Sequence, residues 1–485
     1  MSAVVQEIDQ LFIGGQWVAP SSNLRIESIA PGTGLPLGSV AAADTQDVDR
    51  AVAAARAALD SGEWQRLPPT ARAAALAPLA DAIKERAEEF ATLVSAEVGC
   101  AISYSRTRQV PGAAMMVDYF ASLAASTAWE ERRPGFVKDS IVLREPVGVV
   151  AAVVPWNTPL MSVMVKAIPA LIAGCAVVVK TPPEIALCSV EIAKMLEACD
   201  LPAGLVSLLV ADREVSEHLV SHPDVDKVAF TGSTAVGKRI LEICARSVRR
   251  ATMELGGKSS AIVLDDADLE TTVAGLVAGG MTINGQQCTA QQRVLLPESR
   301  AAEFTEAIVA AVKALKVGDP LDEATEVGPL IAERQRERVE GLLATAREEG
   351  ATVLAGGGRP AGLDAGWYVE PTVLGNVAPD STIGQVEVFG PALCLMIYRD
   401  EDEAVVIANG TEYGLAGAVW TGDEARGERV ARRVRTGMCG VNGLSVDFAA
   451  PFGGIGASGL GREMGPEGLE AFVEYKTLTV PKSQA

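Results

Sequence analysis

The spacing of apolar side chains in the first hundred residues is that of amphipathic helices. Two Ala-rich segments, at 45–59 and 69–98, repeat apolar residues three and four positions apart. Pro68 and Pro69 stand at the start of the second segment, where proline is tolerated because the first helical turn leaves that N–H unpaired. We therefore expect helices over both segments.

From Val147 onward the pattern changes to short β-branched runs separated by helical segments. The runs are VGVVAAVV at 147–154, AVVVK at 176–180, VSLLV at 206–210 and DKVAFT at 226–231. Helical periodicity occupies residues 159–173 and 185–199 between them. This alternation predicts a doubly wound, Rossmann-like parallel sheet with helices on both faces.

A second alternation of strands and helices begins near Ser259 and implies a second α/β unit. Its strand-like runs lie at 260–264, 293–296, 353–354 and 393–398. The segments 129–144 and 475–480 are also strand-like but belong to neither alternation. They are either simple surface hairpins or strands that pair subunits, since exposed sheet edges accept added strands.

Composition excludes several classes of protein. The 485 residues carry a formal net charge of −20, which opposes binding to nucleic acid and to acidic membrane surfaces. The start of the chain lacks the pattern of a signal peptide, and the apolar stretch 147–156 is too short to span a bilayer, so we expect a cytoplasmic protein. Eight cysteines without C-x-x-C spacing and only two histidines favour neither disulfides nor a metal site.

One glycine turn has the form of a phosphate site. The strand-like run 227–231 leads directly into Gly232-Ser233-Thr234-Ala235-Val236-Gly237, which opens a helix. Free backbone N–H groups at such a helix start suit a pyrophosphate, but this segment alone favours Ser233 or Thr234 as a simple helix cap. The literal G-x-G-x-x-G at 454–459 follows no strand and opens no convincing helix, so we do not interpret it as a dinucleotide motif.

Cys288 and Glu254 are the candidates for nucleophile and base. Cys288 follows a glycine turn among polar neighbours, whereas most of the other cysteines lie in apolar or helical runs typical of core residues. Glu254 ends an apolar strand beside two glycines, where burial would raise its pKa toward that of a general base. The alternative for Glu254 is a salt-bridged strand end.

These motifs together resemble the aldehyde dehydrogenase superfamily, from residues 12–15 nearly to the C-terminus. Within it the chain resembles actinobacterial NAD-dependent members, chiefly through WEERRPG at 129–135. The shared blocks are PWN at 155–157, FTGST at 230–234, ELGGK at 254–258, GQQC at 285–288, EVFGP at 387–391, PFGG at 451–454 and SGLGRE at 458–463. The resemblance implies that Cys288 attacks an aldehyde and forms a thiohemiacetal and then a thioester. Asn157 and the Cys288 N–H would hold the oxyanion, and Glu254 would activate the water that releases the acid.

The resemblance also implies sites for an NAD cofactor, with NADP as the alternative. Lys180 and Trp156 would contact its adenosine side, Ser233 its pyrophosphate, and Glu387 with Phe389 its nicotinamide ribose. The full set of expected cofactor contacts is Val154, Pro155, Trp156, Lys180, Glu184, Phe230, Gly232, Ser233, Val236, Leu255, Gln335, Glu387 and Phe389. Glu463 matches a proton-relaying Glu of the family, or else it is a buried partner of Arg462 or Lys258.

The implied organisation has three parts. A cofactor-binding domain would comprise 1–123 and 146–256, a catalytic domain 257–457, and an oligomerisation extension 124–145 and 473–485, which suggests a homodimer or homotetramer. Two departures from the family matter: Pro183 replaces a ribose-binding Glu, for which Glu184 is the substitute, and small residues stand at Thr158, Ser162 and Val165.

The smaller side chains suggest a medium-sized hydrophobic aldehyde as substrate. The competing hypotheses are a CoA-acylating semialdehyde dehydrogenase, which generally lacks the base at position 254, and a non-catalytic protein on the same fold.

Overall fold

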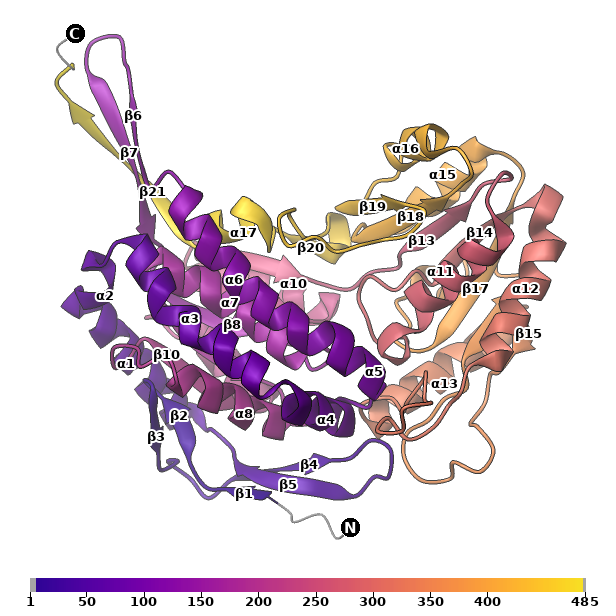
Figure 1. The fold of residues 1–485 in the computed structure, drawn as a ribbon, viewed down its shortest axis with the longest axis horizontal. Helices are drawn as coiled ribbons and strands as arrows, with labels where there is room; N and C mark the ends of the chain where they lie inside the picture. The colour runs from indigo at the N-terminus through magenta and orange to yellow at the C-terminus, as the bar shows by residue number, and fades with distance from the viewer. Residues whose placement is uncertain (1–5, 483–485) are drawn as a thin grey trace.

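The computed structural model describes residues 6–482. The outermost parts of the expected cofactor-binding and oligomerisation segments, 1–5 and 483–485, lie outside the described residues. The chain forms two large α/β halves, a small sheet near the N-terminus and a projecting β arm (Figure 1). The predicted α/β class, with two such units and a β extension, is confirmed.

An eight-stranded sheet organises the first half. Its order is β20 (Gly459–Leu460), β12 (Arg250–Glu254), β11 (Lys227–Thr231), β8 (Val149–Val153), β9 (Ala176–Thr181), β10 (Val206–Val210), β2 (Leu11–Ile13) and β3 (Gln16–Val18). The strands from β12 to β10 are parallel, and the chain reverses its winding direction between β8 and β11. Ligands of doubly wound sheets bind at the carboxyl ends of the strands beside such a reversal.

Helices cover both faces of this sheet and bury its β-branched residues. One face packs on α1 (Thr45–Ser61) and α9 (Arg213–Ser221), with α10 (Thr234–Arg246) beside them. The other face packs on α7 (Pro159–Ala173) and α8 (Ala186–Glu197). A further helical layer then covers α7 and α8: α3 (Pro69–Glu85), α4 (Ala87–Val98) and α6 (Val110–Ser126).

The second half is built on a seven-stranded sheet. Its order is β15 (Thr352–Ala355), β16 (Thr372–Gly375), β17 (Ala392–Tyr398), β14 (Arg293–Pro297), β13 (Ser260–Val263), β18 (Ala416–Trp420) and β19 (Met438–Val441). Only β15 is antiparallel to its neighbour. One apolar layer contains side chains of α11 (Leu269–Met281) and α12 (Ala301–Ala314), and the opposite layer contains those of α13 (Glu333–Glu348), α15 (Glu401–Asn409) and α16 (Glu424–Ala431).

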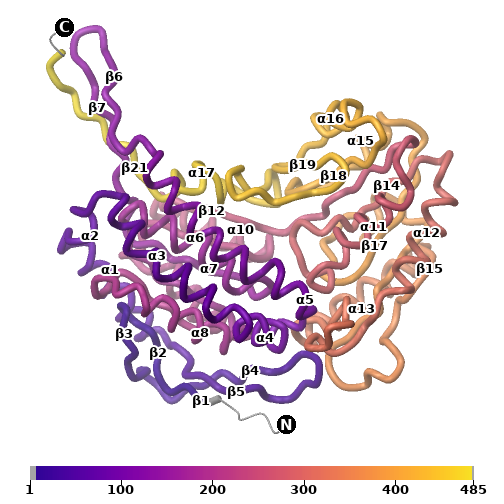
Figure 2. The backbone as a smooth tube through the Cα atoms, viewed as in Figure 1, coloured from indigo at the N-terminus to yellow at the C-terminus, as the bar shows by residue number. Residues whose placement is uncertain are grey.

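Two small sheets complete the fold. β1 (Gln6–Ile8), β5 (Pro36–Ala41) and β4 (Arg25–Ile29) form one sheet, which lies beneath the helices of the first half, as the backbone trace shows (Figure 2). β21 (Val473–Val480), β7 (Asp139–Pro146) and β6 (Glu130–Arg133) form the arm that projects from the body. The short helices are α2 (Glu63–Arg66), α5 (Ile102–Tyr104), α14 (Thr382–Gln385) and α17 (Gly465–Glu470).

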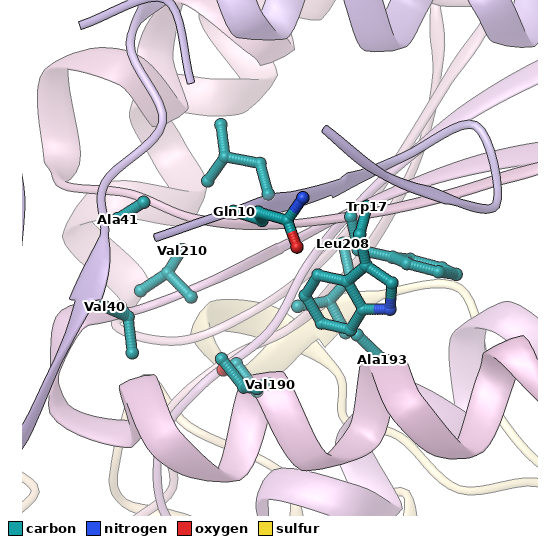
Figure 3. A pocket seen from close by; sticks show the side chains of 11 residues that line it. Gln10, Trp17, Val40, Ala41, Val190, Ala193, Leu208 and Val210 are labelled. Atoms are coloured by element: carbon teal, nitrogen blue, oxygen red, sulfur yellow. The ribbon is translucent and has the colours of Figure 1, made fainter. Parts of the chain in front are cut away.

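The seam between the N-terminal strands and α8 is almost filled. Trp17, Val40, Val190 and Leu208 line a small gap there (Figure 3). Its volume is about 10 Å³, which is room for no more than one water molecule. The Trp17 indole donates a hydrogen bond to Glu197 at 3.1 Å at the end of α8. This seam is therefore part of the packed core and is too small to bind a ligand.

Candidate active site

A cavity of about 770 Å³ opens between the two halves of the molecule, where the carboxyl ends of β8, β11 and β12 face the loop after α11. That volume lies within the range of ligand-binding pockets. The expected catalytic residues Cys288, Glu254 and Asn157 all line it. The expected cofactor contacts that line it are Pro155, Trp156, Gly232, Ser233, Val236, Leu255, Gln335, Glu387 and Phe389.

Cys288 is only partly buried, unlike most other cysteines of the chain, which are fully buried; Cys439 shares its intermediate exposure. Burial, reinforced by the negative charges of Glu387 and Glu254, raises the pKa of the Cys288 thiol to about 12. The thiol is therefore protonated at neutral pH, and forming the thiolate requires a base or an added positive charge in the cavity.

Asn157 lies on the loop that follows β8 and is buried. Its Nδ2 donates a hydrogen bond to the backbone oxygen of Gln286 at 3.0 Å, and Gln109 Nε2 donates to its backbone oxygen at 3.3 Å. One N–H of the Asn157 amide is thus anchored to the segment that carries Cys288. The second N–H has no such bond to the described residues, and Asn157 lines the cavity.

Glu254 ends β12 with 2% of its surface exposed, and neither carboxylate oxygen has a hydrogen-bond partner among the described residues. Desolvation, with repulsion from Glu463, raises its pKa well above the ordinary range. The alternative of a salt-bridged strand end is therefore wrong. A buried, unpaired carboxyl group is costly for stability, which makes a chemical role the better explanation of this residue.

Glu463 forms an ion pair with Lys166 of α7. The hypothesis that its buried partner is Arg462 or Lys258 is therefore wrong. Lys166 Nζ contacts Glu463 Oε1 at 2.5 Å and donates to Thr231 Oγ1 at 2.6 Å, and its side chain is 1% exposed. Lys166 is a single charge within the otherwise apolar helix sequence PLMSVMVKAIPALIA, and that mismatch was the sequence signal that could have identified it.

The glycine turn after β11 does start a helix, as predicted. Ser233 is the N-cap of α10 and its side chain accepts a hydrogen bond from Val236 N at 3.4 Å, so the capping interpretation is confirmed. A Cβ on Gly232 would lie 2.5 Å from the Phe230 ring, so glycine lets the backbone follow this path at the cavity wall. The start of α10 remains open to a bound phosphate group because Ser233 itself lines the cavity.

Aromatic and acidic side chains from the second half form the facing wall. Phe389 packs edge-on against Trp156, with ring centroids 5.3 Å apart, although the two residues belong to opposite halves. Glu387 accepts a hydrogen bond from Gly257 N at 3.0 Å, and burial raises its pKa to about 7. Gln335 Nε2 donates to the Phe389 backbone oxygen at 2.7 Å, which ties this wall to α13.

The other expected cofactor contacts lie near the cavity but do not line it: Val154, Lys180, Glu184 and Phe230. Lys180 is buried, and desolvation lowers its pKa to about 8. Glu184 pairs at 2.5 Å with Arg334, an exposed residue of α13 that lines the cavity. Sequence patterns gave no indication of Arg334 because it lies in an ordinary charged helix.

The end of the cavity away from α10 is mainly apolar and aromatic, and sequence reasoning missed most of its residues. They are Tyr104, Arg108, Gln109, Met161, Val446, Phe448, Phe452 and Met464. A Cβ on Gly112 would lie 2.7 Å from Met161 and 3.7 Å from Phe448, so these two side chains converge on α6. Within residues 6–482, no cluster of acidic, histidine or cysteine side chains is arranged to hold a metal ion, and no helix is long and apolar enough to cross a membrane.

Comparisons with known proteins agree with this geometry. The aldehyde dehydrogenase family signature matches residues 17–478. The chain is 44% identical to geranial dehydrogenase of Castellaniella defragrans over 96% of this chain and 98% of that protein. It superposes on an aldehyde dehydrogenase of Mycobacterium tuberculosis complexed with NAD+ with a TM-score of 0.97, at 44% identity over 99% of this chain and 100% of that one.

A second solved structure is similar over nearly its whole length. It is a mutant of aldehyde dehydrogenase C from Pseudomonas syringae in complex with NAD+ and octanal, with a TM-score of 0.94, 38% identity and 98% of both chains covered. The family signature and these identities over almost the full chain bear out the resemblance seen in the sequence motifs. This chain belongs to the aldehyde dehydrogenase family.

Proposed function

We propose that this protein oxidises a medium-sized hydrophobic aldehyde to its carboxylic acid with NAD+, through a thioester on Cys288. The observation that carries the proposal is the convergence of Cys288, Asn157 and Glu254 on one cavity whose other end meets the N-terminus of α10. A thiol, an amide donor and an unpaired carboxyl group are the three protein groups that this reaction requires.

Cys288 and Asn157 perform the first half of the reaction. The Cys288 thiol gives up its proton to water, which the positive charge of a bound cofactor would favour, and the thiolate sulfur then bonds to the aldehyde carbon. The carbonyl oxygen becomes an oxyanion that the free Asn157 N–H and the Cys288 backbone N–H stabilise. Because Asn157 is already fixed by the Gln286 carbonyl at 3.0 Å, its amide needs no reorientation when charge develops on the oxygen. Collapse of this adduct expels hydride and leaves the acyl group as a thioester on Cys288.

The nicotinamide ring of NAD+, when bound, accepts that hydride. The residues that would hold the cofactor are Ser233 at the start of α10, Trp156 and Phe389 across the cleft, and Glu387. These groups fit a dinucleotide, because a helix start suits a pyrophosphate and a carboxylate suits ribose hydroxyls. On this basis residues 1–123 and 146–256 form the cofactor-binding domain, and 257–457 the catalytic domain.

Glu254 performs the second half by taking a proton from water as that water attacks the thioester. The acid and the free thiol are then released. Burial favours the neutral carboxyl group and so makes Glu254 a strong base once it is ionised. The Lys166–Glu463 pair is close enough to influence this charge electrostatically, and Lys166 opposes the rise of the Glu254 pKa.

The apolar end of the cavity supports the choice of substrate. Met161, Val165, Phe448 and Phe452 offer hydrocarbon and aromatic surface, and the charged side chain at that end, Arg108, would repel a cationic aldehyde. The names of two similar proteins point the same way, since one is a geranial dehydrogenase and one binds octanal in its crystal structure.

The exposed apolar side chains of the β arm favour a homo-oligomer. Phe136 and Val137 at its tip are 103% and 84% exposed, and Tyr475 and Leu478 on β21 are 51% and 39% exposed. A three-stranded sheet with two open edges and exposed apolar side chains is stabilised when a second copy of the chain covers it.

An aldehyde panel tests the proposal. Geranial, octanal, benzaldehyde, acetaldehyde and an aminoaldehyde would be assayed with NAD+ and with NADP+ by the absorbance of the reduced nicotinamide, with and without CoA. We expect the carboxylic acid as product without CoA, and the highest kcat/KM for the larger neutral aldehydes with NAD+. Equal kcat/KM for acetaldehyde and octanal would refute the substrate class, and an acyl-CoA product would refute the role of Glu254.

A further inference from the structure

The loop that carries Cys288 has an unusual backbone. Ile283, Asn284 and Gly285 follow one another with φ values of 51°, 57° and 71°, all in the left-handed region. Glycine adopts this conformation freely and asparagine tolerates it, but a β-branched isoleucine there is strained. Three such residues in a row persist only where surrounding contacts hold them.

The Asn284 side chain provides those contacts. Its Nδ2 donates to the Gly99 and Pro329 backbone oxygens, both at 2.8 Å, and its Oδ1 accepts from Gly328 N at 2.7 Å. Both amide hydrogens are used, and the residue is 1% exposed. Asn284 therefore joins the end of α4 in the first half to the 328–329 segment of the second half.

The contact points are close-packed as well as hydrogen-bonded. A Cβ on Gly328 would lie 2.0 Å from the Gly99 oxygen, and one on Gly99 would lie 2.7 Å from the Pro329 oxygen. On the loop itself, a Cβ on Gly285 would lie 2.1 Å from the Gly390 oxygen. Glycine at 99 and 328 thus lets the two segments that Asn284 bonds lie directly against each other, and glycine at 285 lets the loop pass close to Gly390.

The loop 283–287, which Asn284 fixes, leads directly to Cys288 and to the Asn157 amide. Gln286, which is fully buried, turns its backbone oxygen to the Asn157 amide at 3.0 Å and accepts at its side-chain Oε1 from Ile331 N at 3.1 Å. Two residues further on, Cys288 reaches the cavity wall. The position of the thiol and the orientation of the Asn157 amide therefore depend on one short segment.

We propose that Asn284 is a positioning residue for the nucleophile, because its side chain holds residues 283–287 in the conformation that sets both Cys288 and the Asn157 amide. This inference rests on the function proposed above. Asn284 does not line the cavity, so it acts only through the loop.

The test compares Asn284→Gly with Asn284→Ala and with a matched control. Glycine fits the left-handed backbone and removes only the side-chain bonds, whereas alanine also adds backbone strain. Asn376→Gly is the control, because Asn376 is also left-handed, with φ 53°, and its Nδ2 donates to the Gly350 oxygen at 3.0 Å on the exposed surface. We expect kcat to fall about a hundred-fold in both Asn284 variants with KM little changed, and no change in Asn376→Gly.

A second readout needs neither cofactor nor activity. Iodoacetamide alkylation of Cys288, followed by mass spectrometry, should become faster in Asn284→Gly, because a relaxed loop exposes the thiol and lowers its pKa. Unchanged alkylation of fully buried cysteines such as Cys188 and Cys394 would show that the faster reaction is local to the loop and does not come from partial unfolding of the whole protein.

An Asn284→Asp variant adds a pH profile. Its carboxylate would face two carbonyl oxygens, and protonation would restore one donor. The ratio of its kcat to that of the wild type should therefore rise as the pH is lowered from about 9 to about 6.

Three results would overturn the inference: wild-type kcat and alkylation rate in Asn284→Gly, an equal loss in Asn376→Gly, or failure of Asn284→Gly to fold, which would make the side chain a requirement of the whole fold. A wild type that oxidises no aldehyde would refute the proposed function, while the alkylation comparison would still decide the role of Asn284.

Discussion

Burial and three nearby acidic side chains keep the pKa of the Cys288 thiol high. Glu387, Glu254 and Glu463 all raise its pKa, and no basic side chain is among the principal causes of its shift. A thiol with so high a pKa is mostly protonated in the free protein, and a protonated thiol reacts slowly with oxidants and alkylating agents. From the acidic groups around this thiol we derive two predictions.

The first prediction concerns the reactivity of the free protein. Because the pKa of Cys288 is raised to about 12, the thiolate fraction at neutral pH is small and grows tenfold with each pH unit. The rate of Cys288 alkylation by iodoacetamide should therefore rise without a plateau from about pH 7 to about pH 9.5. Cys288→Ala gives the background rate, and a plateau near neutral pH would contradict the expected burial effect.

The second prediction concerns Glu254→Gln. Its carboxyl group is proposed to act after hydride transfer, so the variant should release about one equivalent of reduced nicotinamide in a rapid first turnover and then fall about a hundred-fold or more in steady-state rate. Stopped-flow absorbance measures both phases. Glu242→Gln, on the exposed face of α10, is the control, and loss of the first turnover in Glu254→Gln would assign the carboxylate to thiol activation as well.

At the scale of elements, the sequence patterns predicted the strongly periodic parts of the fold well. The helix expected at 159–173 is α7 with the same bounds, and the strand runs expected in the two alternations are all strands of the two large sheets, with 353–354 in the edge strand β15. Segment 69–98 instead forms two helices that part at Arg86, where no glycine or proline signals a break and the Arg86 side chain pairs with Glu89 and Glu191.

The site was predictable where its residues belong to compact motifs and unpredictable where it depends on distant contacts. Cys288, Glu254 and Asn157 follow from local blocks, and all three line the cavity. The Lys166–Glu463 pair and the Glu184–Arg334 pair each join residues far apart in the chain. The N-terminal strands are short and only weakly alternating, so they gave no clear pattern.

The third prediction concerns the start of α10. Ser233→Ala removes a cap and should cost about 1 kcal/mol of unfolding free energy, and it should also raise the KM for NAD+ because the same hydroxyl faces the cavity. Ser381→Ala is the matched control, since Ser381 caps α14 with a bond from Gly384 N at 3.3 Å. Denaturant titration and initial rates separate the two effects; an unchanged KM in Ser233→Ala would leave Ser233 as a cap alone.

At the scale of the whole molecule, contacts within one chain do not explain what stabilises the projecting arm. β7 pairs with β21 along its full length, from Asp139 with Val480 to Pro146 with Val473, so the arm joins the middle of the chain to its end. A sheet this thin has little core of its own. Its stability is therefore best accounted for by contact with a second subunit.

The fourth prediction follows from that account. Leu478→Lys places a charge on the exposed face of β21 and should shift the protein to a smaller assembly in size-exclusion chromatography with light scattering. Leu35→Lys, at a residue that is 64% exposed in the turn just before β5, should leave the assembly unchanged. A wild-type protein that elutes as a monomer would refute the role assigned to the arm.

The pairing of β20 with β12 has a consequence for how the molecule is made. Glu254 lies opposite Gly459, and Leu255 N donates to the Ser458 oxygen at 2.9 Å, so the last stretch of the polypeptide frames the carboxyl group. During synthesis, Cys288 is therefore complete long before residues 458–460 can pack against Glu254. On the proposed mechanism, a chain that ends before residue 458 would lack this support for its base and would remain acylated at Cys288 after one reaction.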